Sequence, residues 1–350
     1  IAYLSANLNG LSTCVPNRFE RRIISDNAFI RLGIDMAKRL REDRPDLVHV
    51  QYTGPLNCPV PVVVTVHDVS FLEHPEYFTL PRVLQLRLTV EKTVRSAAKV
   101  ITVSEFSRKC ILKHFKVDPS KVAAIPNAVS SHFRPIQRDQ ARSIVRKRFG
   151  YERPFVVTVG DLQPRKNQIG LIRAFEQLVT SQELPHDLVV VGQNTWYSDH
   201  VTEAAAKSRA ADRIRFTGWV SDDELLALYN ASEMLVFPSF YEGFGLPVLE
   251  AMACGRAVAC SDTSAMPEVA NASAILFDPT RTEEIARAMK DVLLDSQLRT
   301  RMERRGLQRA SQFTLEGTAS QTLELYYEVA GAQRRGVKRL ARRRVPVSGQ

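Results

Sequence analysis

The sequence predicts an α/β protein made of two doubly wound domains, each a parallel sheet covered by helices. Short runs rich in valine and isoleucine recur along the chain, and a helix-like stretch follows each of them. Continuous apolar strands of this kind indicate burial on both faces of a sheet. Strand alternating with helix is typical of doubly wound units. The length of 350 residues is too great for one ordinary core and suits two domains.

The apolar runs divide into two groups. In the first part of the chain the predicted strands are Asp46–Gln51, Val62–His67, Val100–Ser104 and Val122–Pro126. In the second part they are Phe155–Gly160, Leu188–Gly192, Ile214–Gly218, Met234–Pro238, Ala257–Ser261 and Ile275–Asp278. The polar, basic stretch 130–153 separates the groups. We therefore predict a first domain over 1–135, a second over 136–315, a helix over 316–333 and a basic tail over 334–350.

Composition favours a soluble protein. The chain is 44% hydrophobic and 25% charged, and it shows neither an apolar run near the ~18 residues that cross a bilayer nor a secretory leader pattern. Its cysteines form no CxxC pair, which favours reduced thiols over disulfides or zinc ligands; they are Cys14, Cys58, Cys110, Cys254 and Cys260. We expect a cytoplasmic location and no metal.

The net charge of +10 is concentrated near the C-terminus. The basic block comprises Arg334, Arg335, Lys338, Arg339, Arg342, Arg343 and Arg344. One interpretation is a solvated tail. The other is peripheral contact with an anionic surface such as the inner face of a membrane. Nucleic acid is not expected as a partner, because no aromatic residues or recognisable binding module accompany the block.

Two adjacent cations follow the first strand of the second domain. Gly160 ends this strand, and Arg165 and Lys166 lie in the turn before the next helix. At the carboxyl end of a parallel strand they would face the cleft in which such sheets bind ligands. Arg165 can bind two phosphate oxygens at once and Lys166 acts as a point charge, which suits a diphosphate. The alternative is an ordinary solvated basic turn.

A glycine turn lies between the strand ending at Pro238 and the next helix. Gly243 and Gly245 allow close approach of the backbone to a ligand, and a helix start attracts phosphate. Glu242 and Glu250 bracket this turn. The first carboxylate can accept hydrogen bonds from sugar hydroxyls and the second can hold a ribose; alternatively, they are ordinary turn and helix residues.

Two further features lie at predicted strand ends. Val220 precedes Ser221, which with Glu224 forms a capping-box pattern, and the backbone near Val220 is a candidate contact for a base edge. His67 ends an apolar strand in the first domain, where it can reach a sugar or a developing charge; a lone histidine is otherwise more often structural. His49 is expected to be a core or cleft-wall residue.

Together these motifs resemble retaining glycosyltransferases of family 4. The resemblance rests on the run 160–167, the Thr-Gly-Trp-Val-Ser turn at 217–221, and the stretch 242–250 followed by Ala-Met-Ala-Cys-Gly. It covers about residues 45–330 and implies the GT-B fold of two facing Rossmann-like domains, with the C-terminal helix packing back on the first. Family members open with a strand and a glycine-rich turn, but here Ile1–Ser5 resembles a later strand and Gly10 alone does not supply that turn. We therefore expect either an N-terminal truncation or a replaced loop.

The resemblance also implies the roles of the site residues. It places the donor diphosphate on Arg165 and Lys166, the ribose on Glu250, and the transferred sugar beside His67. Glu242 and the amides of Phe244 and Gly245 would hold the sugar hydroxyls. The full expected donor site is Gly160, Arg165, Lys166, Val220, Glu242, Gly243, Phe244, Gly245, Leu246 and Glu250, with His67, Arg165, Lys166 and Glu242 taking part in catalysis.

The residues around Arg165 resemble the mannosyltransferase branch, which makes GDP-mannose the first expected donor and a glycan or lipid-linked sugar the expected acceptor. No Asp-x-Asp triplet is found, so we expect no metal or other cofactor: the two cations and the helix start near Gly245 would balance the leaving diphosphate. Two alternatives stay open. One is an epimerase or phosphorylase on the same fold, and the other is a non-catalytic protein that binds nucleotide-sugars.

Overall fold

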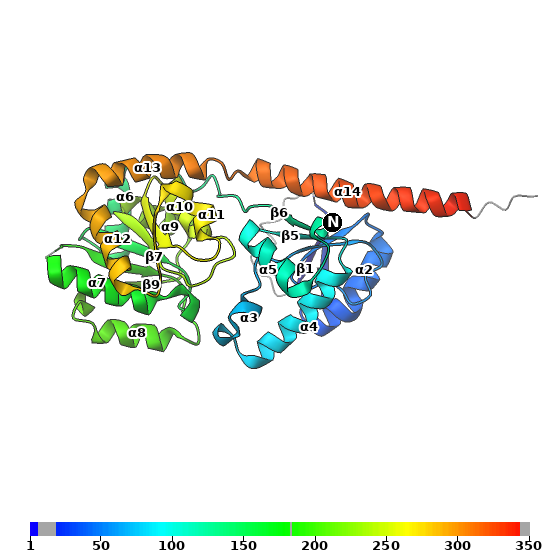
Figure 1. The fold of residues 1–350 in the computed structure, drawn as a ribbon, viewed down its shortest axis with the longest axis horizontal. Coiled ribbons are helices and arrows are strands. Elements are labelled where there is room, and N and C mark those ends of the chain that lie inside the picture. Colours follow the sequence, from blue (N-terminus) through cyan, green and yellow to red (C-terminus); the bar gives the residue numbers. More distant parts are fainter. Residues whose placement is uncertain (6–18, 183, 344–350) are drawn as a thin grey trace, which may run out of the picture.

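Parallel sheets built from the predicted apolar runs form the centres of two neighbouring domains (Figure 1). The computed structural model describes residues 1–5, 19–182 and 184–343. Gly10, Cys14 and the end of the basic tail lie outside these residues.

The first domain contains a four-stranded sheet in the order β3-β4-β5-β6 and a parallel pair, β1 and β2. Its strands are β1 (Ala2–Ser5), β2 (Arg21–Ile24), β3 (Val48–Gln51), β4 (Val62–Thr65), β5 (Lys99–Thr102) and β6 (Val122–Ala124). Its helices are α1 (Ala28–Ile30), α2 (Met36–Asp43), α3 (Ser70–Glu73), α4 (Leu80–Ser96) and α5 (Glu105–Phe115). The sequence pattern does not predict β2, a short strand whose two arginines hide the apolar run on which the other predictions rest.

The second domain contains a six-stranded sheet in the order β12-β11-β10-β7-β8-β9. Its strands are β7 (Phe155–Val159), β8 (Asp187–Val191), β9 (Ile214–Gly218), β10 (Met234–Phe237), β11 (Ala257–Ser261) and β12 (Ile275–Phe277). Its helices are α6 (Arg138–Phe149), α7 (Gln168–Gln182), α8 (Ser198–Lys207), α9 (Asp222–Ala231), α10 (Leu246–Ala253), α11 (Met266–Ala270), α12 (Thr282–Leu294) and α13 (Ser296–Ala310).

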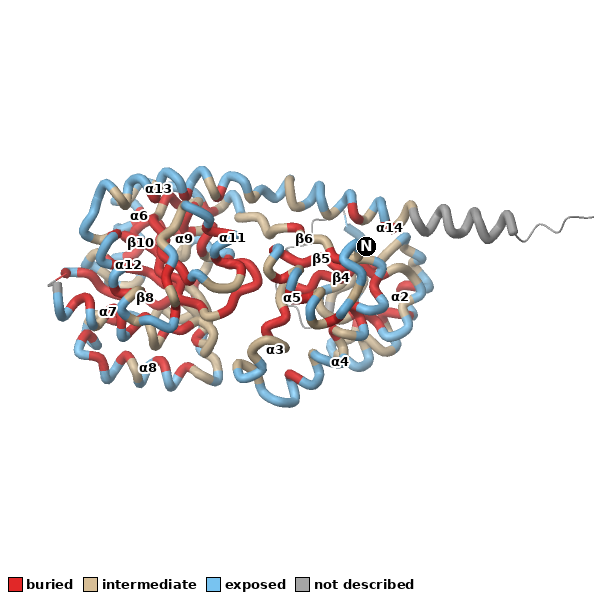
Figure 2. Tube along the Cα trace, viewed as in Figure 1, coloured by how far each residue is buried: buried red, intermediate tan, exposed pale blue. Residues whose placement is uncertain are grey.

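Both faces of the second sheet are buried, as the continuous apolar strands predict. In β7, Val157 packs into one core and Val156 into the core on the opposite face. In β10, Leu235 and Val236 divide in the same way. Figure 2 shows buried segments gathered inside each domain under helices that are exposed on their outer sides. This double burial leaves only the strand ends free to form a site.

The last helix, α14 (Leu315–Arg343), leaves the second domain and passes over the first (Figure 1). Leu325 and Val329 pack with Val63 of β4 and Ile101 of β5, so α14 covers one face of the first sheet. The helix continues to Arg343 and does not end at 333 as expected, because arginine, lysine, leucine and alanine in this stretch all favour helix. Among the described residues, no helix combines the length and apolar character needed to span a bilayer.

Replacing Leu325 with alanine should destabilise the first domain, because the side chain is 7% exposed and its loss leaves a cavity beneath α14. We expect a loss of about 2–4 kcal/mol in the free energy of unfolding, measured by urea denaturation. Leu323 lies on the same helix but is 49% exposed, so Leu323→Ala is the matched control. Equal effects of the two substitutions would contradict the packing described here.

Candidate active site

The strand order of the second sheet brings two loops together. β7 and β10 are hydrogen-bonded neighbours although three strand connections separate them in sequence, and their carboxyl ends lie at the same edge. The loop after β7 carries the cations on a short 3₁₀ turn, Pro164–Lys166. The loop after β10 is the glycine turn, which we define as residues 242–245. A backbone hydrogen bond of 2.8 Å from Phe240 N to Arg165 O ties the two loops together.

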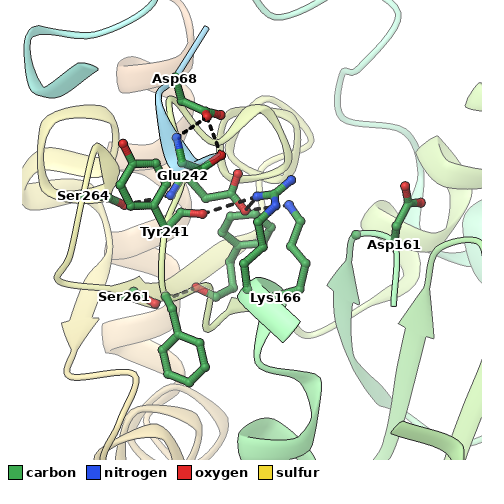
Figure 3. A network of polar contacts seen from close by, with 12 residues as sticks. Asp68, Asp161, Lys166, Tyr241, Glu242, Ser261 and Ser264 are labelled. Atoms are coloured by element: carbon green, nitrogen blue, oxygen red, sulfur yellow. Dashed lines mark hydrogen bonds and ion pairs between the residues drawn. The ribbon is translucent and has the colours of Figure 1, made fainter. Parts of the chain in front are cut away.

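Arg165, Lys166 and Glu242 form one charged cluster, called here the charged triad. Arg165 Nη1 lies 2.8 Å and Lys166 Nζ lies 2.6 Å from the same oxygen, Oε1 of Glu242. Lys166 Nζ also lies 4.9 Å from the centre of the Phe237 ring. Figure 3 shows Glu242 between Asp68 and Lys166. The structure therefore unites three of the residues predicted for the donor site.

The charges of the triad depend on one another because all three side chains are largely buried. Burial opposes ionisation of Glu242, but the positive charges of Lys166 and Arg165 outweigh it and hold the pKa of the carboxyl below its usual range. Burial likewise opposes the charge of Arg165, yet Glu242 raises the pKa of the guanidinium. With both cations and the carboxylate charged, the triad carries one net positive charge. It can therefore attract an anion.

The glycines predicted for the site each allow a close approach. A Cβ on Gly160 would lie 3.0 Å from Cε of Lys166, so the absence of a side chain makes room for the lysine stem. Gly245 adopts φ of 105° as the N-cap of α10, and a Cβ there would lie 2.3 Å from Met266 Cε. A Cβ on Gly243 would lie 2.5 Å from the carbonyl oxygen of His67. The glycine turn is thus pressed against the first domain.

The first domain faces the triad with residues at the ends of β3 and β4. The ring of His67 lies 5.7 Å from that of Tyr52, and burial lowers the pKa of this histidine, which favours the neutral imidazole. Asp68 accepts hydrogen bonds from the backbone N–H and hydroxyl of Ser70, at 2.8 and 2.6 Å. A cavity of 1290 Å³ extends from Arg165 into the first domain and is lined there by Asp68 and Tyr52.

The remaining predicted residues surround the start of α10. Phe244 and Val220 are buried in one apolar core, while Leu246 is 36% exposed. Glu250 lies one turn further along α10 and accepts a hydrogen bond of 2.9 Å from the Tyr229 hydroxyl. Among the described residues, no hydrogen bond or ion pair joins the Glu250 side chain to the triad. Burial raises the pKa of Glu250 to about 6, although the bond from Tyr229 acts in the opposite direction.

Comparison with known proteins assigns the family. The model for glycosyl transferases group 1 matches residues 139–309, and the model for Glycosyltransferase Family 4 matches residues 12–133. O-antigen chain mannosyltransferase B of Escherichia coli is 33% identical over 75% of this chain and 69% of its own length. The chain belongs to glycosyltransferase family 4. It is a glycosyltransferase, as the sequence motifs predict.

Two further similar proteins are matched over very different shares of their own length. The serotype-specific mannosyltransferase WbdA of Escherichia coli is 27% identical over 80% of this chain but only 36% of its own length. The crystal structure of Anabaena HepE in complex with UDP and glucose has a TM-score of 0.73 at 21% identity, over 88% of this chain and 86% of HepE. This likeness confirms the predicted GT-B fold of two facing Rossmann-like domains.

Some residues around the triad have little signal of a site role in the sequence. Tyr52 and Asp68 look like ordinary residues after a strand, and only the facing of the two domains brings them near Arg165. Ser104 has the sequence pattern of an N-cap for α5, which the structure confirms, but it also contacts the glycine turn. The clue that the sequence offers for Asp68 is its position directly after the candidate His67.

The triad should show strong energetic coupling. Glu242→Gln leaves two buried cations without their counter-ion, and we expect it to cost about 3–5 kcal/mol of stability. Lys166→Met leaves Glu242 paired with Arg165 and should cost less. In a double-mutant cycle that combines Glu242→Gln with Lys166→Met, the coupling free energy between the two residues should be roughly 1–3 kcal/mol, measured by urea unfolding at pH 7.

The control cycle uses Glu91 and Arg95, which form an exposed ion pair at 2.9 Å on α4. Solvent screens this pair, so its coupling should be far smaller than that of the triad. Similar coupling in the two cycles would show that the triad is solvated in solution.

Proposed function

We propose that this glycosyltransferase transfers a hexose from a nucleotide-sugar to a hydroxyl group of a glycan or lipid-linked acceptor, with retention of anomeric configuration and without a metal. GDP-mannose is the first expected donor. The single observation that carries the proposal is the charged triad beneath the glycine turn, at the carboxyl ends of two neighbouring strands. This is the place at which doubly wound sheets bind nucleotides.

In this proposal Arg165 and Lys166 bind the donor diphosphate. As the bond to the sugar breaks, negative charge builds up on the leaving nucleoside diphosphate. The two cations and the free N–H groups at the start of α10 stabilise that charge. They thereby have the role that a divalent metal has in other transferases. Supporting this, the cations are held in place before the donor arrives, so little reorganisation is needed.

Glu242 positions the sugar and does not act as a nucleophile. Both cations contact its Oε1, which leaves Oε2 as the oxygen to accept sugar hydroxyls together with the amides of Phe244 and Gly245. A carboxylate neutralised by two cations is a weak nucleophile, which argues against a covalent intermediate on Glu242. The acceptor hydroxyl would instead attack on the face from which the diphosphate departs. His67, neutral at pH 7, would contact the same sugar.

The choice of donor and acceptor rests on relatives. The names of the two Escherichia coli relatives specify mannosyl transfer, and one specifies an O-antigen chain. HepE was crystallised in complex with UDP and glucose, so the nucleotide base is the part of the proposal that needs a direct test. The basic end of α14 supports contact with an anionic membrane face, where a lipid-linked acceptor would be found.

Nucleotide binding should stabilise the enzyme by mass action. With GDP at about 100 times its Kd, stabilisation of about 2.7 kcal/mol should raise the Tm by about 5–10 °C, and UDP and ADP should give smaller shifts. Arg165→Ala should abolish the shift. Transfer from GDP-mannose to methyl mannoside is then followed by NMR in excess EDTA, and the product should keep the anomeric configuration of the donor.

The outcomes separate the parts of the proposal. A larger increase in Tm with UDP than with GDP would mean that the donor is a UDP-sugar, and the proposed mechanism would stand. Loss of transfer in EDTA would remove metal independence, and inversion in the product would remove retention. No shift with any of the nucleotides would overturn the proposed site.

Donor binding should tighten with rising pH if Glu250 holds the ribose. With a pKa of about 6, Glu250 in the free site is mostly protonated at pH 5.5 and mostly ionised at pH 7.5, and ribose hydroxyls favour the carboxylate. Since only the ionised fraction binds well, the Kd for GDP-mannose should fall about fourfold between pH 5.5 and 7.5. GDP-mannose is the probe because it lacks a terminal phosphate, whose second pKa of about 6 would interfere.

Calorimetry on wild type and Glu250→Gln measures this effect. Glu250→Gln should bind GDP-mannose more weakly than wild type at pH 7.5, and its Kd should not show the fourfold change between pH 5.5 and 7.5. His67 also titrates below its usual range and is the same in both proteins, so a pH dependence that survives in Glu250→Gln belongs to another group.

A further inference from the structure

Two hydroxyl groups of the first domain hold the glycine turn of the second. Ser104 Oγ donates to the carbonyl oxygen of Gly243 at 2.7 Å, and Ser107 Oγ donates to the same oxygen at 3.3 Å. Ser104 is 2% exposed and Ser107 is fully buried. Both serines lie at the start of α5, directly after β5. One backbone carbonyl thus receives both of its hydrogen bonds from across the domain boundary.

A carboxylate of the second domain makes the reciprocal contact. Glu268 of α11 accepts hydrogen bonds from the backbone N–H groups of Glu105 and Phe106, at 2.9 and 3.1 Å. These are free N–H groups in the first turn of α5, where a negative charge is favourable. The start of α5 therefore donates two hydroxyl hydrogen bonds to the glycine turn and two backbone hydrogen bonds to one carboxylate of the second domain. We call Ser104, Ser107, Gly243 and Glu268 the interdomain latch.

Polar contacts of this kind suit an interface that opens and closes. When the domains separate, water can satisfy the serine hydroxyls, the Gly243 carbonyl and the amides of α5, so opening leaves no buried polar group unpaired. Closure needs a residue without a side chain at position 243, because a Cβ there would lie 2.9 Å from Asp68 Cβ as well as against the His67 carbonyl. The latch therefore forms at one defined separation of the domains.

The geometry points to a role in positioning: the interdomain latch fixes the glycine turn against His67, so that the sugar-binding groups of both domains meet only in the closed cleft. This inference rests on the proposed function, in which Glu242 and the amides of Phe244 and Gly245 hold the transferred sugar. Ser104, Ser107 and Glu268 are not among the residues proposed to touch the donor. They act through the turn, and they make the transfer step depend on closure while nucleotide binding stays with the second domain.

Serine variants separate positioning from binding and from folding. In Ser107→Ala and Ser104→Ala, kcat for transfer should fall about fivefold and tenfold respectively, and about fiftyfold in the double variant, because each loses one hydrogen bond made in the closed state. The Kd of GDP, measured by calorimetry, should stay within about twofold of wild type. Ser104 also caps α5, so Asp295→Ala, which removes the cap of α13 far from the cleft, controls for the loss of a helix cap.

A steric variant tests the same closure independently. Gly243→Ala should reduce kcat by at least about tenfold, because the methyl group would hold the domains apart. Gly33→Ala is the control, since a Cβ there meets nothing within 4 Å.

The outcomes of these experiments separate the latch from the proposed function. If the wild-type enzyme is active and both serine variants have the same kcat as wild type, the proposed role of the latch is wrong but the proposed function stands. A loss of GDP binding equal to the loss of kcat would assign the serines to the donor site. A wild type that neither binds nucleotide nor transfers sugar would overturn the proposed function and the latch with it.

Discussion

The site depends on one carboxylate that holds two cations in a place with little water. Glu242 binds Arg165 and Lys166 through a single oxygen, and this contact joins the loop after β7 to the loop after β10. The loops can meet only because β10 lies beside β7 in the sheet. A different strand order would leave the same residues at separate points along the edge. The topology of the second sheet therefore determines whether the charged triad can form.

Such a cluster is a poor way to gain stability. Removing charged groups from water costs several kcal/mol for each ion, and a well-packed apolar replacement is often as stable or more so. The triad is better understood through its net positive charge, which a diphosphate can neutralise. The buried position strengthens that attraction because the surrounding dielectric is low. An anionic ligand bound at the triad would offset part of the stability lost by burying Glu242 and its partners.

The sequence reveals the second domain more fully than the first. The strands of the second sheet and the capping box at Ser221 follow from local patterns, because apolar runs and turn residues report on burial and on strand ends. Local patterns also place Arg165 and Glu242 at strand ends, but their meeting depends on the strand order. The contacts of Ser104 and Glu268 do not, because a serine cap and a helix glutamate look the same whether or not another domain faces them. The sequence pattern underestimates the length of α14 for a related reason: its charged end gives no apolar stripe, although its residues favour helix.

The chain crosses between the domains twice, and both crossings lie together. The backbone N–H of Val129, on the way into the second domain, bonds the carbonyl of Phe313, on the way out, at 3.1 Å. Phe313 in turn packs against Phe244 of the glycine turn, with ring centres 5.7 Å apart. A paired crossing restricts the domains to rotation about one line, since neither connection can lengthen alone. Gly243, which accepts the serine hydrogen bonds of the latch, directly precedes Phe244 in the glycine turn. The crossing and the latch therefore hold the same short turn, one through Phe313 and the other through Ser104 and Ser107. A change in the angle between the domains would act on this turn from both sides.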